Sequence, residues 1–307
     1  MPLLSVEGLR TRYGRGAYAV DGVSLDVAAG ETVGLVGESG CGKSTLGKTI
    51  LRLVDPSAGS IQLGGVELAK LGQRALVPHR RRMQMVFQDP FGSLNPRQSI
   101  GTLLETPLAV HGECDAAKRR QRVLEIIGKV GLPLSALERY PHEFSGGQRQ
   151  RIGIARALVL RPELIICDEP VSALDLSIQA QILNLLVDLK REFGLAYLFI
   201  SHDLSVVRYF ADRVLVMYLG RIVESAGHAA LWREPRHPYT RALLASVPQA
   251  SATRDRGQAV IRGELTKAPE AGCRFRARCP LAAERCATEE PALRPMADGH
   301  LTACHFA

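Results

Sequence analysis

The sequence predicts an α/β fold with a mainly parallel sheet, an inserted helical segment and a loop-rich C-terminal tail. Short apolar runs alternate with helical periodicity between residues 164 and 218. A glycine-rich loop at 37–45 separates an apolar run from an apolar-periodic segment, as expected for a strand, a loop and a helix. Past about residue 247 the periodicity fades. The 307 residues suffice for one large domain or two of ordinary size.

Each expected element follows from a local pattern. Apolar β-like runs, separated by glycine-rich turns, lie at 5–10, 18–27, 31–36, 60–63 and 83–87. From residue 89 to about 156 the pattern becomes helical, with a helix beginning near Gly146. The alternation that follows predicts strands at 164–167, 197–201 and 214–218 and helices at 178–193 and 204–210.

Composition narrows the class of protein. Hydrophobic residues make up 46% and charged residues 23%, which is usual for a globular protein, and the net charge of +8 comes from scattered basic residues. Aromatic residues at 5% disfavour a base-stacking surface for nucleic acid. Neither a signal peptide nor an apolar run of about 18 residues is visible. Seven cysteines without a secretory signal argue against a disulfide framework. We expect a cytosolic protein, at most peripheral to a membrane.

The loop at 37–45 reads GESGCGKST and matches the pattern G-x-x-x-x-G-K-[ST]. Triphosphate oxygens need several converging backbone N–H groups, and glycine lets the backbone approach them closely. The following helix N-terminus adds partial positive charge, Lys43 reaches the β- and γ-phosphates, and Ser44 offers a hydroxyl to Mg²⁺. The predicted phosphate-binding residues are Gly37, Ser39, Gly40, Gly42, Lys43, Ser44 and Thr45.

Two further motifs could bind ions: one a metal ion and the other an anion. LIICDE at 164–169 is an apolar strand that ends in Asp168 and Glu169. A carboxylate at a strand tip can hold Mg²⁺, and its neighbour can polarise an attacking water. SGGQ at 145–148 opens a helix, where a hydroxyl, free N–H groups and the helix dipole form a second anion site. Two phosphate-binding helix starts suggest two half-sites.

From residue 3 to 247 the sequence resembles the ATP-binding subunits of ABC transporters, with the family's motifs in the family's order. The resemblance implies a RecA-like P-loop ATPase core at 1–247 with an antiparallel β subdomain. It also implies a helical subdomain at about 89–156 and a C-terminal extension at 248–307. Phe144 stands where leucine is commoner in the signature motif.

The resemblance implies a role for each matched residue. Glu169 corresponds to the catalytic glutamate, His202 to the switch histidine and Gln88 to the Q-loop glutamine. Ser44, Gln88 and Asp168 correspond to the residues that order Mg²⁺. Tyr13 is placed where the family stacks an aromatic ring on adenine, although Tyr18 is the alternative. The matched signature and D-loop residues are Ser145, Gly146, Gly147, Gln148 and Asp175.

Longer stretches are similar to oligopeptide and dipeptide importers, including VFQDPFGSLNPRQSIG at 86–101 and HPYTRALL at 237–244. GCGKSTLGKTI and DPFGSLNPR resemble the F-type subunit, the second of two paralogous ATPases in that family. Importers of nickel or another small solute share much of this pattern and stay the alternative. A soluble ABC ATPase acting on DNA or ribosomes is disfavoured, because the chain shows neither inserted coiled coils nor a second cassette.

The resemblance also implies partners. These are two membrane permease subunits, a paralogous ATPase or a second copy as dimer partner, and indirectly an extracytoplasmic peptide-binding protein, without nucleic acid. The expected location is the cytoplasmic face of the inner membrane. Segment 89–110 would receive a coupling helix of the permease. Its apolar residues line that groove or belong to the helical core: Phe91, Leu94, Ile100 and Leu103.

Four cysteines crowd the tail, at Cys273, Cys279, Cys286 and Cys304. Their spacing decides little by itself, but four thiols in a loop-rich segment suggest a metal. The stretch resembles the tail of peptide-importer ATPases, which implies a [4Fe-4S] cluster, with zinc or unliganded thiols as alternatives. We expect nearby arginines to offset the cluster's negative charge: Arg274, Arg276, Arg278 and Arg285.

Overall fold

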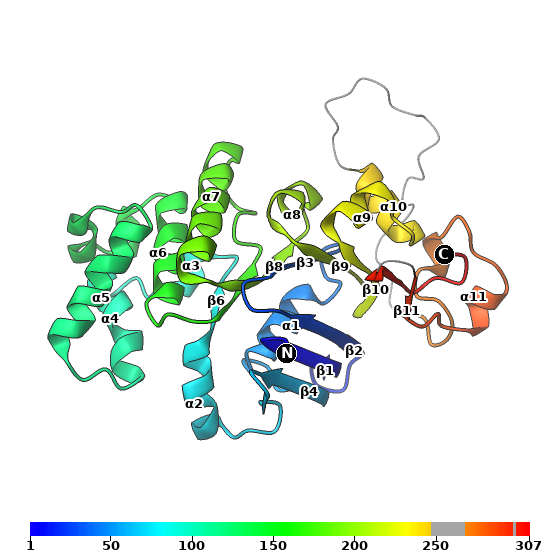
Figure 1. Ribbon diagram of the computed structural model, residues 1–307, viewed down its shortest axis with the longest axis horizontal. Coiled ribbons are helices and arrows are strands. Elements are labelled where there is room, and N and C mark those ends of the chain that lie inside the picture. Colours follow the sequence, from blue (N-terminus) through cyan, green and yellow to red (C-terminus); the bar gives the residue numbers. More distant parts are fainter. Residues whose placement is uncertain (247–267, 297–298) are drawn as a thin grey trace. The chain divides into compact units, whose positions relative to one another are not determined.

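The computed structural model describes residues 1–246, 268–296 and 299–307, and its chain divides into two compact units (Figure 1). The signature unit contains Met1–Leu4, Val27–Glu31 and Leu63–Leu198. The phosphate-loop unit contains Ser5–Asp26, Thr32–Gln62 and Phe199–Ala307. The expected domain boundary at 247/248 falls on residues outside the described ranges, so that boundary stays a prediction.

The phosphate-loop unit contains two groups of hydrogen-bonded strands. In one group β1 (Leu4–Arg12) lies between β2 (Tyr18–Val27) and β4 (Ala58–Leu63). In the other the order is β11 (Arg294–Pro295), β12 (Leu301–Thr302), β10 (Arg221–Gly227), β9 (Arg213–Tyr218) and β3 (Thr32–Val36). Its helices are α1 (Lys43–Ile50), α8 (Leu204–Phe210), α9 (His228–Arg233), α10 (Pro238–Ala245) and α11 (Arg285–Thr288).

Strand β3 explains why the phosphate loop is placed where it is. β3 pairs in parallel with β9, with Val33 opposite Arg213 and Val36 opposite Val216. All five β3 residues are buried, which suits a parallel strand covered on both faces. The loop therefore leaves the carboxyl end of a rigid, buried strand.

The signature unit is mostly helical. β6 (Met83–Val86) and β7 (Leu164–Asp168) pair in parallel, with Val86 opposite Cys167. The other elements are β5 (Val66–Glu67), α2 (Gln73–Arg82), α3 (Pro90–Ser93), α4 (Ile100–Val110), α5 (Ala116–Lys129), α6 (Gly146–Leu158) and α7 (Leu176–Phe193), with 3₁₀ turns at Leu134–Glu138 and Pro141–Glu143. The fully buried β8 (Ala196–Ser201) leads the chain from this unit into the other.

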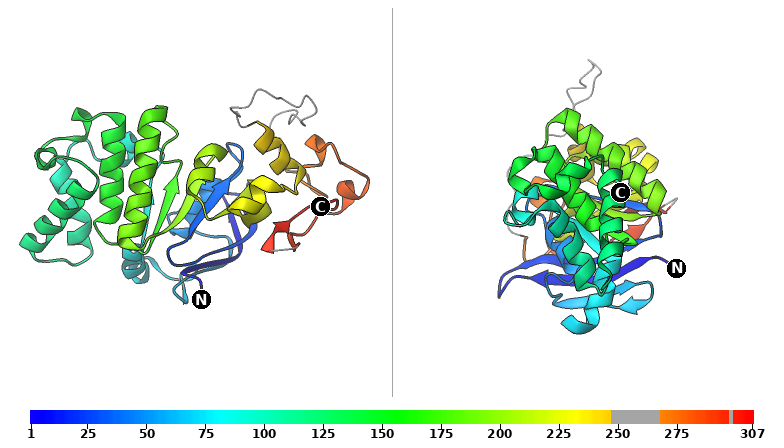
Figure 2. Two further views of the ribbon diagram at one scale, coloured as in Figure 1. Left: turned by 45° about the horizontal axis from the view of Figure 1, so that its top comes forward. Right: turned by 90° about the vertical axis from the view of Figure 1, so that its left-hand side faces the viewer.

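Helices α6 and α7 lie side by side in both ribbon figures (Figures 1 and 2). A Cβ added at Gly147 would lie 2.5 Å from Ile178 Cγ2, so glycine permits this close approach. The Asp175 carboxylate accepts a hydrogen bond from the Ile178 N–H at 3.0 Å and caps α7. With this cap, α7 begins at Leu176, two residues before the helix start expected at residue 178.

Three of the apolar residues expected at a permease groove or in the core are core residues. Leu94, Ile100 and Leu103 are buried within the chain itself. The side chain of Phe91 lies outside the described residues. Among the described residues, moreover, no helix combines the length and the apolar character that crossing a membrane demands.

The described residues of the tail contain more regular structure than the weak periodicity suggests. β12 pairs antiparallel with β10, with Thr302 opposite Glu224. The buried Glu224 carboxylate lies 2.6 Å from His300 Nε2 and also accepts the backbone N–H of His237 at 3.0 Å. These contacts come from distant parts of the chain, so sequence periodicity could not show them.

We expect His237 to make the stability of the phosphate-loop unit pH-dependent. Its Nδ1 accepts the Tyr239 N–H at 3.1 Å and caps α10. Burial lowers the His237 pKa from 6.5 to about 4. Between these values the unfolded chain binds a proton that the folded chain does not. The free energy of unfolding should therefore fall by up to about 3 kcal/mol as the pH drops through this window.

The measurement is the pH dependence of unfolding by denaturant for the wild type and for His237→Asn between pH 7 and 4.5. Asparagine keeps a cap acceptor for Tyr239 but does not titrate. The variant should lose less stability over this range than the wild type. Equal slopes would show that His237 does not contribute.

Candidate active site

The phosphate loop joins β3 to α1, and its path depends on two glycines. A Cβ at Gly37 would lie 2.2 Å from Met217 O, and a Cβ at Gly42 would lie 2.1 Å from Ala19 O. Gly42 also has φ +109° and precedes the first residue of α1. Side chains cannot occupy either position, because backbone atoms cannot move away as flexible side chains can. The spacing of the glycines in the motif thus has a direct steric cause.

Lys43 is the first residue of α1 and is buried. Its Nζ donates to Gly37 O at 2.7 Å and to Glu38 O at 2.9 Å, which holds the ammonium against the loop. Thr45 Oγ1 lies 3.5 Å from Tyr13 Oη at the edge of the loop. The structure therefore brings together the lysine, the loop carbonyls and one of the two tyrosines considered for adenine.

The two tyrosines differ in their surroundings. The Tyr13 residue is 58% exposed, and its hydroxyl is beside the phosphate loop. Tyr18 is 37% exposed, and its ring lies 5.8 Å from the Arg10 guanidinium and 5.3 Å from that of Arg12. Tyr13 thus offers an open ring face at the loop, whereas Tyr18 is engaged by arginines.

In the signature unit, Asp168 ends β7 and is buried, and Glu169 follows it. Glu169 has φ +47°, a conformation that costs free energy in a residue with a side chain. Its carbonyl accepts from Ser172 N–H at 3.3 Å and from Ser172 Oγ at 3.1 Å. Its Oε2 accepts from Gln88 Nε2 at 3.0 Å. Two residues separated by 81 positions in the sequence are thereby joined, and their catalytic roles stay a prediction.

The SGGQ segment forms a capping box at the start of α6. Ser145 Oγ accepts the Gln148 N–H at 3.4 Å, and Gln148 Oε1 accepts the Ser145 N–H at 3.0 Å. Both residues are exposed, so this helix start faces outward from the unit. Asp175 caps the neighbouring α7, and its hydrogen bonds with Ile178 N–H and Ser177 lower the pKa of its carboxyl. It is therefore an anion at neutral pH.

The site residues expected from the sequence divide between the two units. The phosphate loop, Tyr13 and the exposed His202 belong to the phosphate-loop unit. The signature unit holds Gln88, Asp168, Glu169, Asp175 and 145–148. Sequence analysis missed the contacts that the C-terminal region makes with Glu38 in the phosphate loop. No local sequence pattern predicts these contacts.

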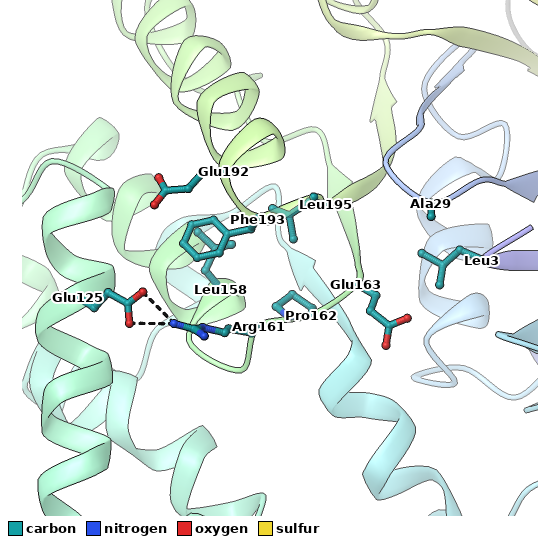
Figure 3. Close-up of a pocket in the computed structure, with 11 residues that line it drawn as sticks. Leu3, Ala29, Glu125, Leu158, Arg161, Pro162, Glu163, Glu192, Phe193 and Leu195 are labelled. Atoms are coloured by element: carbon teal, nitrogen blue, oxygen red, sulfur yellow. Dashed lines mark hydrogen bonds and ion pairs between the residues drawn. The ribbon is translucent and has the colours of Figure 1, made fainter.

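A separate pocket in the signature unit has a volume of about 560 Å³ (Figure 3). Its wall includes Glu163, which immediately precedes β7, whereas Asp168 is the last residue of that strand. It also includes Arg161, which contacts the Glu125 carboxylate at 3.0 and 3.2 Å. The pocket therefore lies at the opposite end of β7 from the Asp168–Glu169 pair.

Comparison with known proteins agrees with these motifs. Residues 20–172 match the family model described as ABC transporter, and residues 223–286 match the oligopeptide/dipeptide transporter C-terminal region. A putative peptide import ATP-binding protein of Brucella ovis is 51% identical over 99% of this chain and 97% of its own length. The oligopeptide transport ATP-binding protein AppF of Bacillus subtilis is 52% identical over 94% and 89%. The chain belongs to the ATP-binding subunits of ABC transporters.

Solved ABC cassettes share the fold. The cbiO1 structure from Clostridium perfringens has a TM-score of 0.69 at 29% identity and covers 76% of this chain and 91% of its own. A dimeric structure of the cassette MJ0796, described as bound to ADP and Pi, has a TM-score of 0.67 at 30% identity and covers 73% and 98%. The α/β P-loop ATPase fold expected from the sequence is confirmed.

The four tail cysteines of this ABC subunit are free thiols, as are the other three. Cys273 N–H donates to Cys286 O at 2.8 Å. Burial raises the pKa of the Cys273 and Cys279 thiols, and in each case the other tail thiolates contribute to the rise. Among the described residues, however, no group of three or more His, Cys, Asp or Glu side chains is arranged to hold a metal ion. The described residues therefore do not support the [4Fe-4S] expectation.

The charge compensation expected of the tail arginines stays a prediction: each guanidinium has partners other than the thiols, while Arg285 also interacts electrostatically with Cys286. Arg274 pairs with Asp21 and with Glu290, and Arg278 pairs with Glu38. Arg285 pairs with Glu289, and Arg276 donates to the carbonyls of Ala271 and Ala287. Arg274 and Arg278 therefore fasten the tail to the rest of its unit, whereas the contacts of Arg276 and Arg285 lie within the tail.

The packing of Gly42 generates a direct test. Gly42→Ala should destabilise the protein and weaken nucleotide binding at least tenfold, because its Cβ meets a backbone carbonyl. Gly40→Ala is the matched control: Gly40 has φ +79°, but a Cβ there meets nothing within 4 Å. That control carries only the left-handed backbone cost of about 1–2 kcal/mol. Thermal unfolding and nucleotide titration of both variants make the measurement; equal effects would contradict the steric account.

Proposed function

We propose that this ABC subunit hydrolyses ATP to energise the uptake of dipeptides or oligopeptides. The main support for peptides as the cargo is the match of residues 223–286 to the oligopeptide/dipeptide transporter C-terminal region. It is supported by near full-length relatives whose names describe peptide import or oligopeptide transport. The narrower likeness to the F-type subunit rests on the sequence motifs alone.

The residues of the phosphate loop bind and orient the triphosphate in this proposal. Lys43, held by two loop carbonyls, places a cation beside the phosphates, and the α1 N-terminus supplies N–H groups. Tyr13 stacks on the adenine. Ser44, the buried Asp168 and Gln88 would provide the hydroxyl, carboxylate and amide oxygens that Mg²⁺ prefers. When bound, Mg²⁺ offsets charge on the phosphates.

Glu169 acts as the base that orients and deprotonates the attacking water. The hydrogen bond from Gln88 Nε2 fixes the direction of its carboxylate, and the Ser172 contacts fix its backbone. His202 contacts the γ-phosphate and stabilises the charge that develops there. In this proposal Gln88 has two roles: it donates a hydrogen bond to the base Glu169, and it helps to hold Mg²⁺.

The signature segment acts on a second nucleotide. We infer that residues 145–148 of one subunit cover the nucleotide bound by another, so that closing the dimer completes two sites. The capping box presents an outward-facing helix start for this purpose. The partner is a second copy or a paralogue, and one solved cassette of the same fold is described as dimeric. Two permease subunits would hold the dimer at the cytoplasmic face of the membrane.

Glu169→Gln tests the assignment. The amide keeps the shape of the side chain but cannot accept the proton, so ATP turnover should fall at least a hundredfold while nucleotide affinity is kept. Asp188→Asn, an exposed change of the same kind on α7, is the control and should match the wild type. ATPase rates and nucleotide titration provide the readout. Turnover near that of the wild type in Glu169→Gln would exclude this residue as the base.

We propose also that Cys273, Cys279, Cys286 and Cys304 ligate a metal centre, in the first instance [4Fe-4S]. The support is the concentration of four thiols within residues 273–304. Four thiolates would complete the iron coordination of such a cluster.

Anaerobic purification followed by iron, sulfide and zinc analysis tests this. Iron and sulfide should copurify with the wild type and with Cys114→Ser, a change at an exposed cysteine far from the tail in sequence, but not with Cys279→Ser. Stoichiometric zinc without iron would replace the cluster with a zinc site. A metal-free wild type would exclude both.

A further inference from the structure

Glu38, in the phosphate loop, is held by three groups. Its backbone N–H donates to Tyr239 Oη at 2.9 Å. Its carboxylate accepts two hydrogen bonds from Arg278, Nη1 to Oε2 at 2.8 Å and Nη2 to Oε1 at 2.9 Å. Its carbonyl accepts from Lys43 Nζ at 2.9 Å. The N–H, the carboxylate and the carbonyl of one loop residue are therefore all directed at once.

Two of these partners come from the far end of the sequence. Tyr239 lies in α10, and Arg278 ends the 3₁₀ turn Arg276–Arg278, immediately before Cys279. Both lie within 223–286, the match to the oligopeptide/dipeptide transporter C-terminal region, and outside 20–172, the match to the ABC transporter model. The C-terminal region thus reaches into the motif that binds the phosphates.

The two residues are themselves fixed by packing. Tyr239 is fully buried, and the Arg278 side chain is only 8% exposed. The rings of Tyr218, Tyr239 and Phe275 form one cluster, with centroids 4.7 to 5.5 Å apart. The Arg278 guanidinium lies 6.0 Å from the Tyr218 ring centroid. A bidentate contact made from such a rigid base restrains its partner more than an exposed ion pair does.

This restraint has a consequence for nucleotide binding. The loop must present its amides and Lys43 to the phosphates in one conformation, and a mobile loop would lose entropy on binding. Because Lys43 bonds to the Glu38 carbonyl, holding Glu38 also directs the ammonium. Preorganisation of this kind raises affinity without any contact to the ligand.

We propose that Tyr239 and Arg278 are positioning residues for the phosphate loop, through which the C-terminal region sets the affinity for ATP. The inference rests on the proposed nucleotide binding. It assigns the C-terminal region a role at the nucleotide loop besides any role in holding metal or peptide-transport partners. A purely structural contact is the alternative, in which Arg278 and Glu38 only fasten the tail.

The test uses the full-length protein and separates affinity from stability. Arg278→Ala should weaken nucleotide binding about tenfold and raise the KM for ATP, while kcat at saturating ATP is largely kept. Glu38→Ala should do the same, and the double variant should be no worse than either single one, because the two changes remove the same interaction. Thermal unfolding is recorded for each variant.

If Arg278→Ala impairs folding, more conservative variants can still test the proposal. Arg278→Lys retains the charge but not the two-pronged contact, and should lose affinity by an intermediate factor. Tyr239→Phe removes only the hydroxyl that accepts the Glu38 N–H, and should weaken binding a few-fold. Arg241→Ala is the matched control, since Arg241 lies in α10, is exposed and contacts Pro235 O rather than the loop.

The outcomes are distinct. Lower affinity in the Arg278, Glu38 and Tyr239 variants, with the control unchanged, supports the proposal. Unchanged affinity with a lower unfolding temperature would show that the contact only fastens the tail and would overturn it. A wild-type protein that binds no nucleotide would instead overturn the proposed function itself.

Discussion

The close packing of the phosphate loop against backbone carbonyls is the constraint on which the rest depends. Gly37 and Gly42 leave no room for a side chain beside Met217 O and Ala19 O. The loop therefore follows a fixed path from the buried strand β3 into α1, and Lys43 begins that helix. The proposed contacts of Lys43 and the loop amides with the triphosphate start from this path.

The same loop connects the ATPase chemistry to the C-terminal region. Glu38 is bound by Tyr239 and Arg278. Strand β12 pairs with β10, which comes before both of these residues in the sequence. The tail arginines make ion pairs and carbonyl contacts inside their unit. A segment with little core of its own thus gains order by docking on charged and aromatic partners.

Much of the fold and site could be predicted, because the informative patterns are local. Strands β3, β7 and β9 are short apolar runs next to turn residues, and helix α7 shows a repeating apolar face. Other features were not predictable. Strand β10 and the tail strands depend on pairing partners elsewhere, and the different surroundings of Tyr13 and Tyr18 depend on where the nearby arginines lie.

By itself the sequence determined the phosphate loop, the Asp168–Glu169 strand tip and the capped SGGQ helix start, since each is a matter of a few neighbouring residues. Only the tertiary structure decided which distant residues meet: Gln88 with Glu169, and Glu38 with Arg278. The physical reason is that backbone conformation follows from neighbours in the chain. Hydrogen bonds between side chains 81 or 240 residues apart require the packed core to bring them together.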